Sequence, residues 1–134
     1  MIVNIRTALS LALLGSALQA RADVVVVGNP AATPMTLDQV SDAYLGKIAS
    51  ITLYDLTDAS PGRVEFDRKA LGKDPGQLKA LWARLAFTGK GQPPREVADD
   101  AAVKKAVAAN PKAIGYIDAA SVDGSVKVLL TLPR

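Results

Sequence analysis

Hydrophobic residues in this chain form short runs separated by polar segments that contain glycine and proline. The runs at 24–27, 51–54, 114–117 and 126–130 are continuous and rich in β-branched residues, which predicts strands. Between them, apolar residues recur at helical spacing, with helices expected from residues 36, 61, 77 and 99 and a short strand at 95–97. Strands that alternate with helices predict an α/β fold. We expect three layers, α/β/α, around a mixed and mostly parallel sheet.

Local signals mark where the predicted helices begin. Thr36 is followed three residues later by Gln39, which is the pattern of a capping box. The adjacent acidic residues Asp99 and Asp100 fit the positive end of a helix, so they are not expected to act as a catalytic pair. The helices expected from residues 36 and 99 thus each have a start signal in the sequence.

The segment around residue 60 is interpreted as a turn followed by a helix. Residues 55–62 are polar and rich in turn formers, and Pro61 suits the first turn of a helix. That helix is expected to run to about Leu71, with Val64 and Leu71 on its inner face beside Phe66.

The first 22 residues have the pattern of an export signal. Arg6 precedes an apolar run at 8–18, and Ala20-Arg21-Ala22 supplies small residues for cleavage after Ala22. The run is too short for a transmembrane anchor, and the absence of cysteine leaves no lipoprotein anchor. We expect residues 1–22 to be a signal peptide and residues 23–134 to form one domain in the periplasm.

Composition excludes several classes of function. The chain has no histidine and no cysteine, which removes thiolate nucleophiles, disulfides, Ser-His-Asp triads and the usual zinc ligands. Two of the 16 basic residues lie in the leader, so the rest nearly balance the 13 acidic ones. With one tryptophan, three tyrosines and two phenylalanines, no base-stacking surface is expected. The composition predicts a non-enzyme without a cofactor that does not bind nucleic acid.

Two other features have ordinary structural interpretations. Lys90, in Gly89-Lys90-Gly91, lacks the following serine or threonine of a phosphate loop, so a surface turn is expected. Trp82 shares helical spacing with Leu78, Leu81 and Leu85, which predicts a buried helix face and not a ligand shelf.

A series of short motifs appears in an order typical of one known family. The motifs are Asn29-Pro30, Leu37-Asp38-Gln39-Val40, Tyr44-Leu45-Gly46-Lys47, Gly91-Gln92-Pro93-Pro94 and Pro111-Lys112-Ala113-Ile114-Gly115-Tyr116. Together they resemble one lobe of the phosphate-type substrate-binding proteins of ABC transporters. The resemblance implies a type II periplasmic binding-protein fold, in which two lobes close over an anion. Because this chain matches a single lobe, we expect no closed anion pocket within one copy.

The resemblance also places an oxyanion at a helix start, which corresponds here to 59–63. Ser60, Gly62 and Arg63 are the expected ligand-binding residues: a hydroxyl donor, a point of close approach and a two-pronged cation. The alternative is that Ser60 only caps the helix. Pro61 lacks an N–H, and Asp55 and Asp58 would repel a dianion, although in this family an aspartate can accept the proton of hydrogenphosphate.

Two functions therefore stay open from the sequence. The first is a non-catalytic binding domain for phosphate or a similar small oxyanion. The second is an interaction module whose uncovered surface meets another periplasmic protein or a second copy of the chain.

Overall fold

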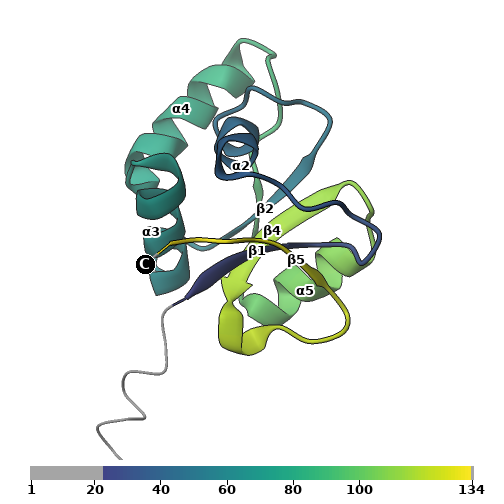
Figure 1. Ribbon diagram of the computed structural model, residues 1–134. Helices are drawn as coiled ribbons and strands as arrows, with labels where there is room; N and C mark the ends of the chain where they lie inside the picture. The colour runs from purple at the N-terminus through teal and green to yellow at the C-terminus, as the bar shows by residue number, and fades with distance from the viewer. Residues whose placement is uncertain (1–22, 134) are drawn as a thin grey trace, which may run out of the picture.

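The computed structural model describes residues 23–133, and the predicted signal peptide lies outside this range. One five-stranded sheet forms the centre of the molecule (Figure 1). Its strands are β1 (Val24–Gly28), β2 (Thr52–Leu56), β3 (Arg95–Val97), β4 (Ala113–Asp118) and β5 (Lys127–Thr131). The helices are α2 (Leu37–Tyr44), α3 (Pro61–Phe66), the π-helical η1 (Asp67–Leu71), α4 (Pro75–Phe87), α5 (Asp100–Ala108) and the 3-10 turn η2 (Ala119–Ser121).

The sheet is mixed, and its spatial order is β3-β2-β4-β1-β5. Strand β2 runs parallel to both β3 and β4, whereas β1 runs antiparallel to β4 and β5. The predicted α/β class with a mixed sheet is confirmed. In the parallel part, β2 leads into α3 and β3 leads into α5, so these two helices begin near the carboxyl ends of their strands.

Helices cover both faces of the sheet, as Figure 1 shows. On one face, α5 packs against β4, where a Cβ atom added to Gly115 would lie 2.6 Å from Val103 Cγ1. On the other face, the next residue, Tyr116, stacks on Phe66 of α3, with ring centroids 4.0 Å apart. Tyr44 of α2 meets both of these rings edge-on. The three aromatic side chains join α2 and α3 to the sheet.

The structure confirms the predicted starts of helices α2 and α5 and moves the start of α4. Thr36 and Gln39 form the expected capping box of α2. Helix α4 begins at Pro75, earlier than expected, because Asp74 forms a second capping box with Gln77. Asp99 caps α5 by accepting a hydrogen bond from Ala102 N–H.

Two expectations near residue 60 were wrong. Strand β2 extends to Leu56, so Asp55 lies in the strand and is buried, whereas the sequence suggested a solvated turn. Val64 is 45% exposed, and Arg63 takes the inner position beside Phe66 instead. An alternation of apolar and polar residues does not show that an arginine will turn inward to meet buried carboxylates.

Among residues 23–133, no helix combines the length and the apolar character that crossing a membrane would require.

Candidate functional site

The start of α3 presents unpaired amide groups. Ser60 occupies the N-cap position with an extended backbone, and Pro61 is the first helical residue. The Ser60 side chain makes no cap hydrogen bond, contrary to the interpretation that it serves only as a cap. In a helix the first N–H groups have no intrahelical acceptor, so those of Gly62 and Arg63 remain available as donors. The macrodipole adds partial positive charge at the same place.

A cavity of about 410 Å³ opens in front of this helix start. Its lining comes from β1, the end of β2, the start of α3, the start of α5 and the end of β4. The lining residues are Asp23, Val24, Leu56, Ser60, Pro61, Gly62, Glu65, Asp100 and Asp118. Four of them carry carboxylates and none carries a positive charge, so the cavity has an acidic wall opposite the amide donors.

The cavity is shaped by close packing at Gly62. A Cβ atom at this position would lie 3.1 Å from Leu56 Cδ1 and 3.5 Å from Ser60 Oγ. A larger residue would therefore press on the end of β2 and crowd the Ser60 hydroxyl. Packing against Leu56 and Ser60 thus accounts for a glycine here, and close approach of a ligand to its backbone stays a prediction.

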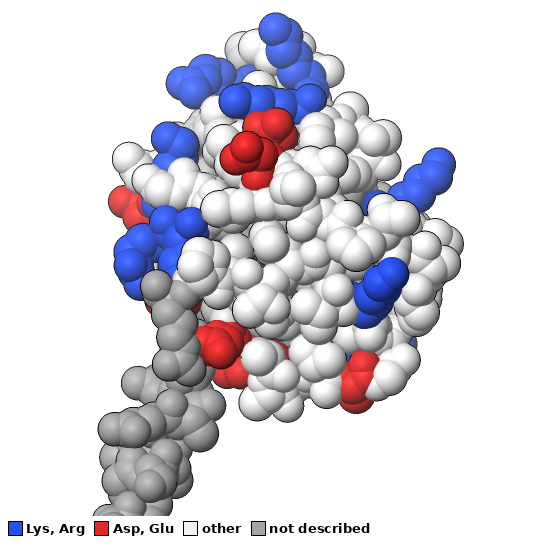
Figure 2. Space-filling model, in the orientation of Figure 1, with Lys and Arg blue, Asp and Glu red and all other residues white. Residues whose placement is uncertain are grey.

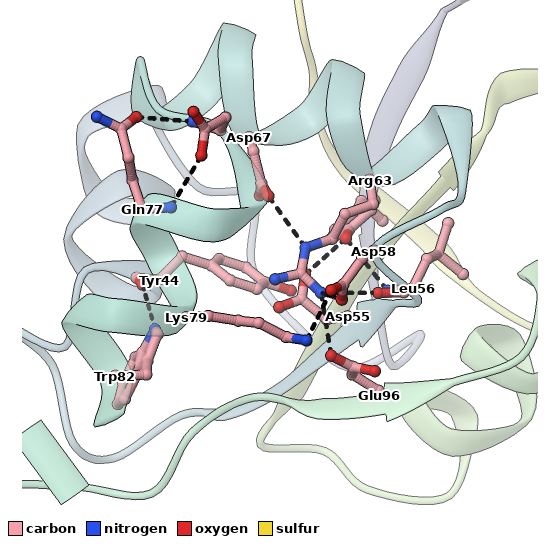
Figure 3. Close-up of polar contacts among 12 residues, drawn as sticks. Tyr44, Asp55, Leu56, Asp58, Arg63, Asp67, Gln77, Lys79, Trp82 and Glu96 are labelled. Carbon is pink, nitrogen blue, oxygen red and sulfur yellow. Dashed lines mark hydrogen bonds and ion pairs between the residues drawn. The ribbon is translucent and has the colours of Figure 1, made fainter. Parts of the chain in front are cut away.

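Arg63 points away from the cavity and into the protein. Figure 3 shows its guanidinium surrounded by carboxylates, and the side chain is only 4% exposed. Nε donates to Asp67 Oδ2 at 3.0 Å, and Nη1 donates to the Leu56 carbonyl at 2.9 Å. Asp55 Oδ1 lies 3.7 Å from Nε. The two-pronged contact with an anion that the sequence suggested is not available to a guanidinium held in this way.

The rim of this buried cluster reaches the surface. Arg63 Nη1 lies 3.3 Å from Glu96 of β3 and 3.7 Å from Asp58, both of which are partly exposed. Asp58 is also paired with Lys79 of α4 at 2.6 Å (Figure 3). One arginine thus ties β2, β3, α3 and η1 together, and Asp58 extends the network to α4.

Burial and charge shift the titration of the cluster. Desolvation raises the pKa of Asp67 to about 6, although its hydrogen bond from Arg63 opposes the shift. Desolvation also raises the pKa of Asp55, against the hydrogen bond from Tyr116 and the charge of Arg63. Burial alone would lower the pKa of Arg63, but Asp55 and Asp67 raise it overall. The guanidinium therefore stays charged, and the buried carboxylates depend on it.

Tyr116 completes the inner side of the cluster. Its hydroxyl donates to Asp55 Oδ1 at 2.6 Å and accepts from the Leu56 amide at 3.1 Å. Burial, followed by the charge of Asp55, raises the pKa of Tyr116. The hydroxyl therefore remains a hydrogen-bond donor, a role that no local pattern in the sequence indicates.

Asp67 keeps one oxygen without a partner. Its side chain is fully buried, and Oδ1 makes no hydrogen bond within the described part of the chain. The residue begins the π-helical turn η1. An unpaired buried oxygen favours the protonated carboxyl, since a charged oxygen without a donor is costly in a low dielectric.

We expect stability to depend on pH through Asp67. Because its pKa is about 6 in the folded protein against 3.8 for an ordinary aspartate, the native state binds a proton that the unfolded chain has released. The contribution of Asp67 to stability is therefore fully present below pH 3.8 and is lost as the pH rises through about 6. Urea unfolding at a series of pH values should show wild type losing stability relative to Asp67→Asn over this window. Asp38→Asn, at an exposed position, should track wild type; an Asp67→Asn variant that does so too would contradict the assignment.

Within residues 23–133, no group of three or more acidic side chains is arranged to hold a metal ion.

Comparison with solved structures confirms the resemblance at the level of the fold. The chain superposes on an ABC-type phosphate transport receptor from Vibrio cholerae with a TM-score of 0.62 and 21% identity. It also superposes on a putative phosphate ABC transporter substrate-binding protein from Clostridium perfringens, solved with bound phosphate, with a TM-score of 0.65 and 23% identity. Each match covers 82% of this chain.

The match is to part of these proteins only. The chain spans 46% of the first structure and 45% of the second. No protein-family model matches the sequence, and neither does any curated protein. The chain has the fold of a partial lobe of a phosphate ABC transporter substrate-binding protein.

Proposed function

We propose that this chain is a non-catalytic, solute-binding-protein-like lobe that binds a small, proton-bearing oxyanion such as hydrogenphosphate at the start of α3. The observation that carries the proposal is the uncapped helix start, where Ser60, Pro61 and Gly62 line the cavity of about 410 Å³. The ligand contacts are the Ser60 hydroxyl and the backbone N–H groups of Gly62 and Arg63. We further propose that the mature domain begins at Asp23 and works in the periplasm.

The charges around the cavity define which oxyanion is accepted. Carboxylates of Asp100 and Asp118 repel a fully ionised anion, but they accept hydrogen bonds from a ligand that keeps an acidic proton. The Arg63 guanidinium is already paired inside the protein, and among the described residues that line the cavity no basic side chain offsets that repulsion. We therefore propose millimolar affinity and a preference for phosphate over sulfate, which carries no proton near neutral pH.

An amide chemical-shift titration tests this proposal. Phosphate added to the isotope-labelled mature protein should shift the Gly62 and Arg63 amides in a saturable way, and sulfate at matched ionic strength should shift them less. Ser60→Ala should weaken phosphate binding by roughly fivefold, the value of one hydrogen bond of about 1 kcal/mol. Ser50→Ala, an exposed serine beyond the other end of β2, is the control and should bind as wild type does. Equal responses to both anions, or no response, would refute the oxyanion proposal.

A second candidate function is an interaction module. The two ends of the described region lie next to each other beside the cavity. Leu132 N–H donates to the Val24 carbonyl at 3.1 Å, and Val24 lines the cavity. This chain spans 46% of one solved structure and 45% of the other. In this second candidate function, the acidic edge around the cavity contacts another protein or a second copy of the chain.

Site-specific photo-crosslinking separates this candidate from the first. In cells that export the protein to the periplasm, a photoreactive residue at position 61, on the cavity edge, should form a crosslinked adduct with one defined partner. The same residue at position 87, on the exposed end of α4, should not give that adduct. Identical adducts from both positions, or none from position 61, would remove the interaction candidate.

A further inference from the structure

A second cavity lies beyond the amino-terminal end of β2, opposite the oxyanion site. Its volume is about 320 Å³, within the usual range for small-molecule sites. The segment after α2, the helix α4 and the loop before β3 enclose it. Leu56, at the carboxyl end of β2, lines the cavity at the start of α3. Leu53, nearer the other end of β2, lines this second cavity, so β2 separates the two cavities.

The inner wall of this cavity is apolar and includes the indole of Trp82. Ile48, Ile51 and Leu53 supply the other apolar surfaces. The indole orientation is fixed, because its N–H donates to the Tyr44 carbonyl at 3.0 Å (Figure 3). A rigid aromatic wall of this kind suits a flat apolar group.

Glycine keeps the space beside the indole open. Gly91, in the loop before β3, has a φ of 154°, and a Cβ atom there would lie 3.5 Å from Trp82 Cζ3. A side chain at this position would lie against the ring and fill part of the cavity. The loop therefore leaves room next to Trp82, whereas its sequence suggested only a surface turn.

All charged residues that line this cavity are basic. Lys90 and Arg95 contribute to it, and no aspartate or glutamate does. Neither cation forms an ion pair within the described part of the chain. In Figure 2, basic side chains gather at the upper end of the molecule, where Figure 1 places the carboxyl-terminal end of α4. The cavity thus pairs an apolar wall with two available cations.

We propose that this cavity binds an amphipathic carboxylate, with a flat apolar body against Trp82 and a carboxylate beside Lys90 and Arg95. Apolar area supplies the attraction and the two cations select the sign of the charge. The proposal is independent of the oxyanion site, because it uses different residues at the other end of β2.

Trp82 is the only tryptophan, so its fluorescence reports directly on this cavity. The probe is phenylbutyrate, and phenylbutylamine, with the same apolar body and the opposite charge, is the control ligand. Titration of the mature protein in a phosphate-free buffer should give a saturable change in emission with the carboxylate and none with the amine. The same response to both ligands, or no saturable response, would overturn the proposal.

Substitutions on the cavity lining test whether the fluorescence change comes from binding in this cavity. The double variant Lys90→Gln/Arg95→Gln should weaken binding by about fivefold, as expected for the loss of two exposed ion contacts. Ala49→Leu places a larger side chain on the cavity lining and should also weaken it, whereas Lys105→Gln, an exposed cation on α5, should leave it unchanged. Far-UV circular dichroism verifies that each variant is folded. Unchanged affinity in both cavity variants would place the ligand elsewhere and reject the site.

Discussion

Replacing Arg63 with methionine should lower the free energy of unfolding by roughly 3–5 kcal/mol, because it leaves buried carboxylates without their cation. Asp67 would lose the hydrogen bond at 3.0 Å, and Asp55 would lose a charge 3.7 Å away. Methionine keeps much of the apolar volume, so the loss reports mainly on charge and hydrogen bonding. Urea unfolding monitored by circular dichroism measures it.

Arg68→Met is the matched control for this experiment. Arg68 is 67% exposed and pairs only with Glu65 among the described residues, so its removal should cost less than about 1 kcal/mol. The Arg63→Met loss should also shrink at low pH, where Asp55 and Asp67 take up protons. If Arg63→Met does not fold at neutral pH, recovery of structure on acidification is the expected result. A loss no greater than that of Arg68→Met, or one independent of pH, would contradict the role assigned to Arg63.

Phe66→Ala should destabilise the fold by roughly 3–5 kcal/mol, the usual cost of removing a fully buried phenylalanine. The Phe66 ring is completely buried and lies between the rings of Tyr44 and Tyr116. Its loss opens a cavity and removes the contact that holds α3 and the Arg63 cluster against the sheet. Thermal and urea unfolding both measure the effect.

The chain supplies its own control for this substitution. Phe87, the other phenylalanine, is 92% exposed at the end of α4, and Phe87→Ala should change stability by less than about 0.5 kcal/mol. Similar losses in the two variants would mean that the aromatic cluster does not organise the core as described.

Local signals allowed the outline of the fold to be predicted. The apolar run of β1 is buried along its whole length, as expected for a central strand covered on both faces. Capping residues such as Thr36 and Asp99 act within a single turn, so the sequence is sufficient to locate helix starts. Strand order was less accessible, since the antiparallel pairing of β1 with its two neighbours depends on contacts distant in sequence.

The role of Arg63 was the main feature that could not be predicted. The expectation that it meets a ligand treated 55–62 as a solvated turn, but β2 carries Asp55 into the core. One signal was present: Arg63 and Asp67 are four residues apart and share a helix face, which favours an internal ion pair. The contribution of Glu96 depends on the parallel pairing of β2 and β3, which no local pattern reveals.

The most direct test of the central claim is one NMR titration that observes the Arg63 side chain and backbone together. We expect the Arg63 Nε–H to exchange slowly with solvent and its resonance not to move with phosphate, since it donates to buried Asp67. The Gly62 and Arg63 backbone amides should shift in the same titration. Movement of the side-chain resonance with unmoved backbone amides would mean that the guanidinium, and not the helix start, meets the anion.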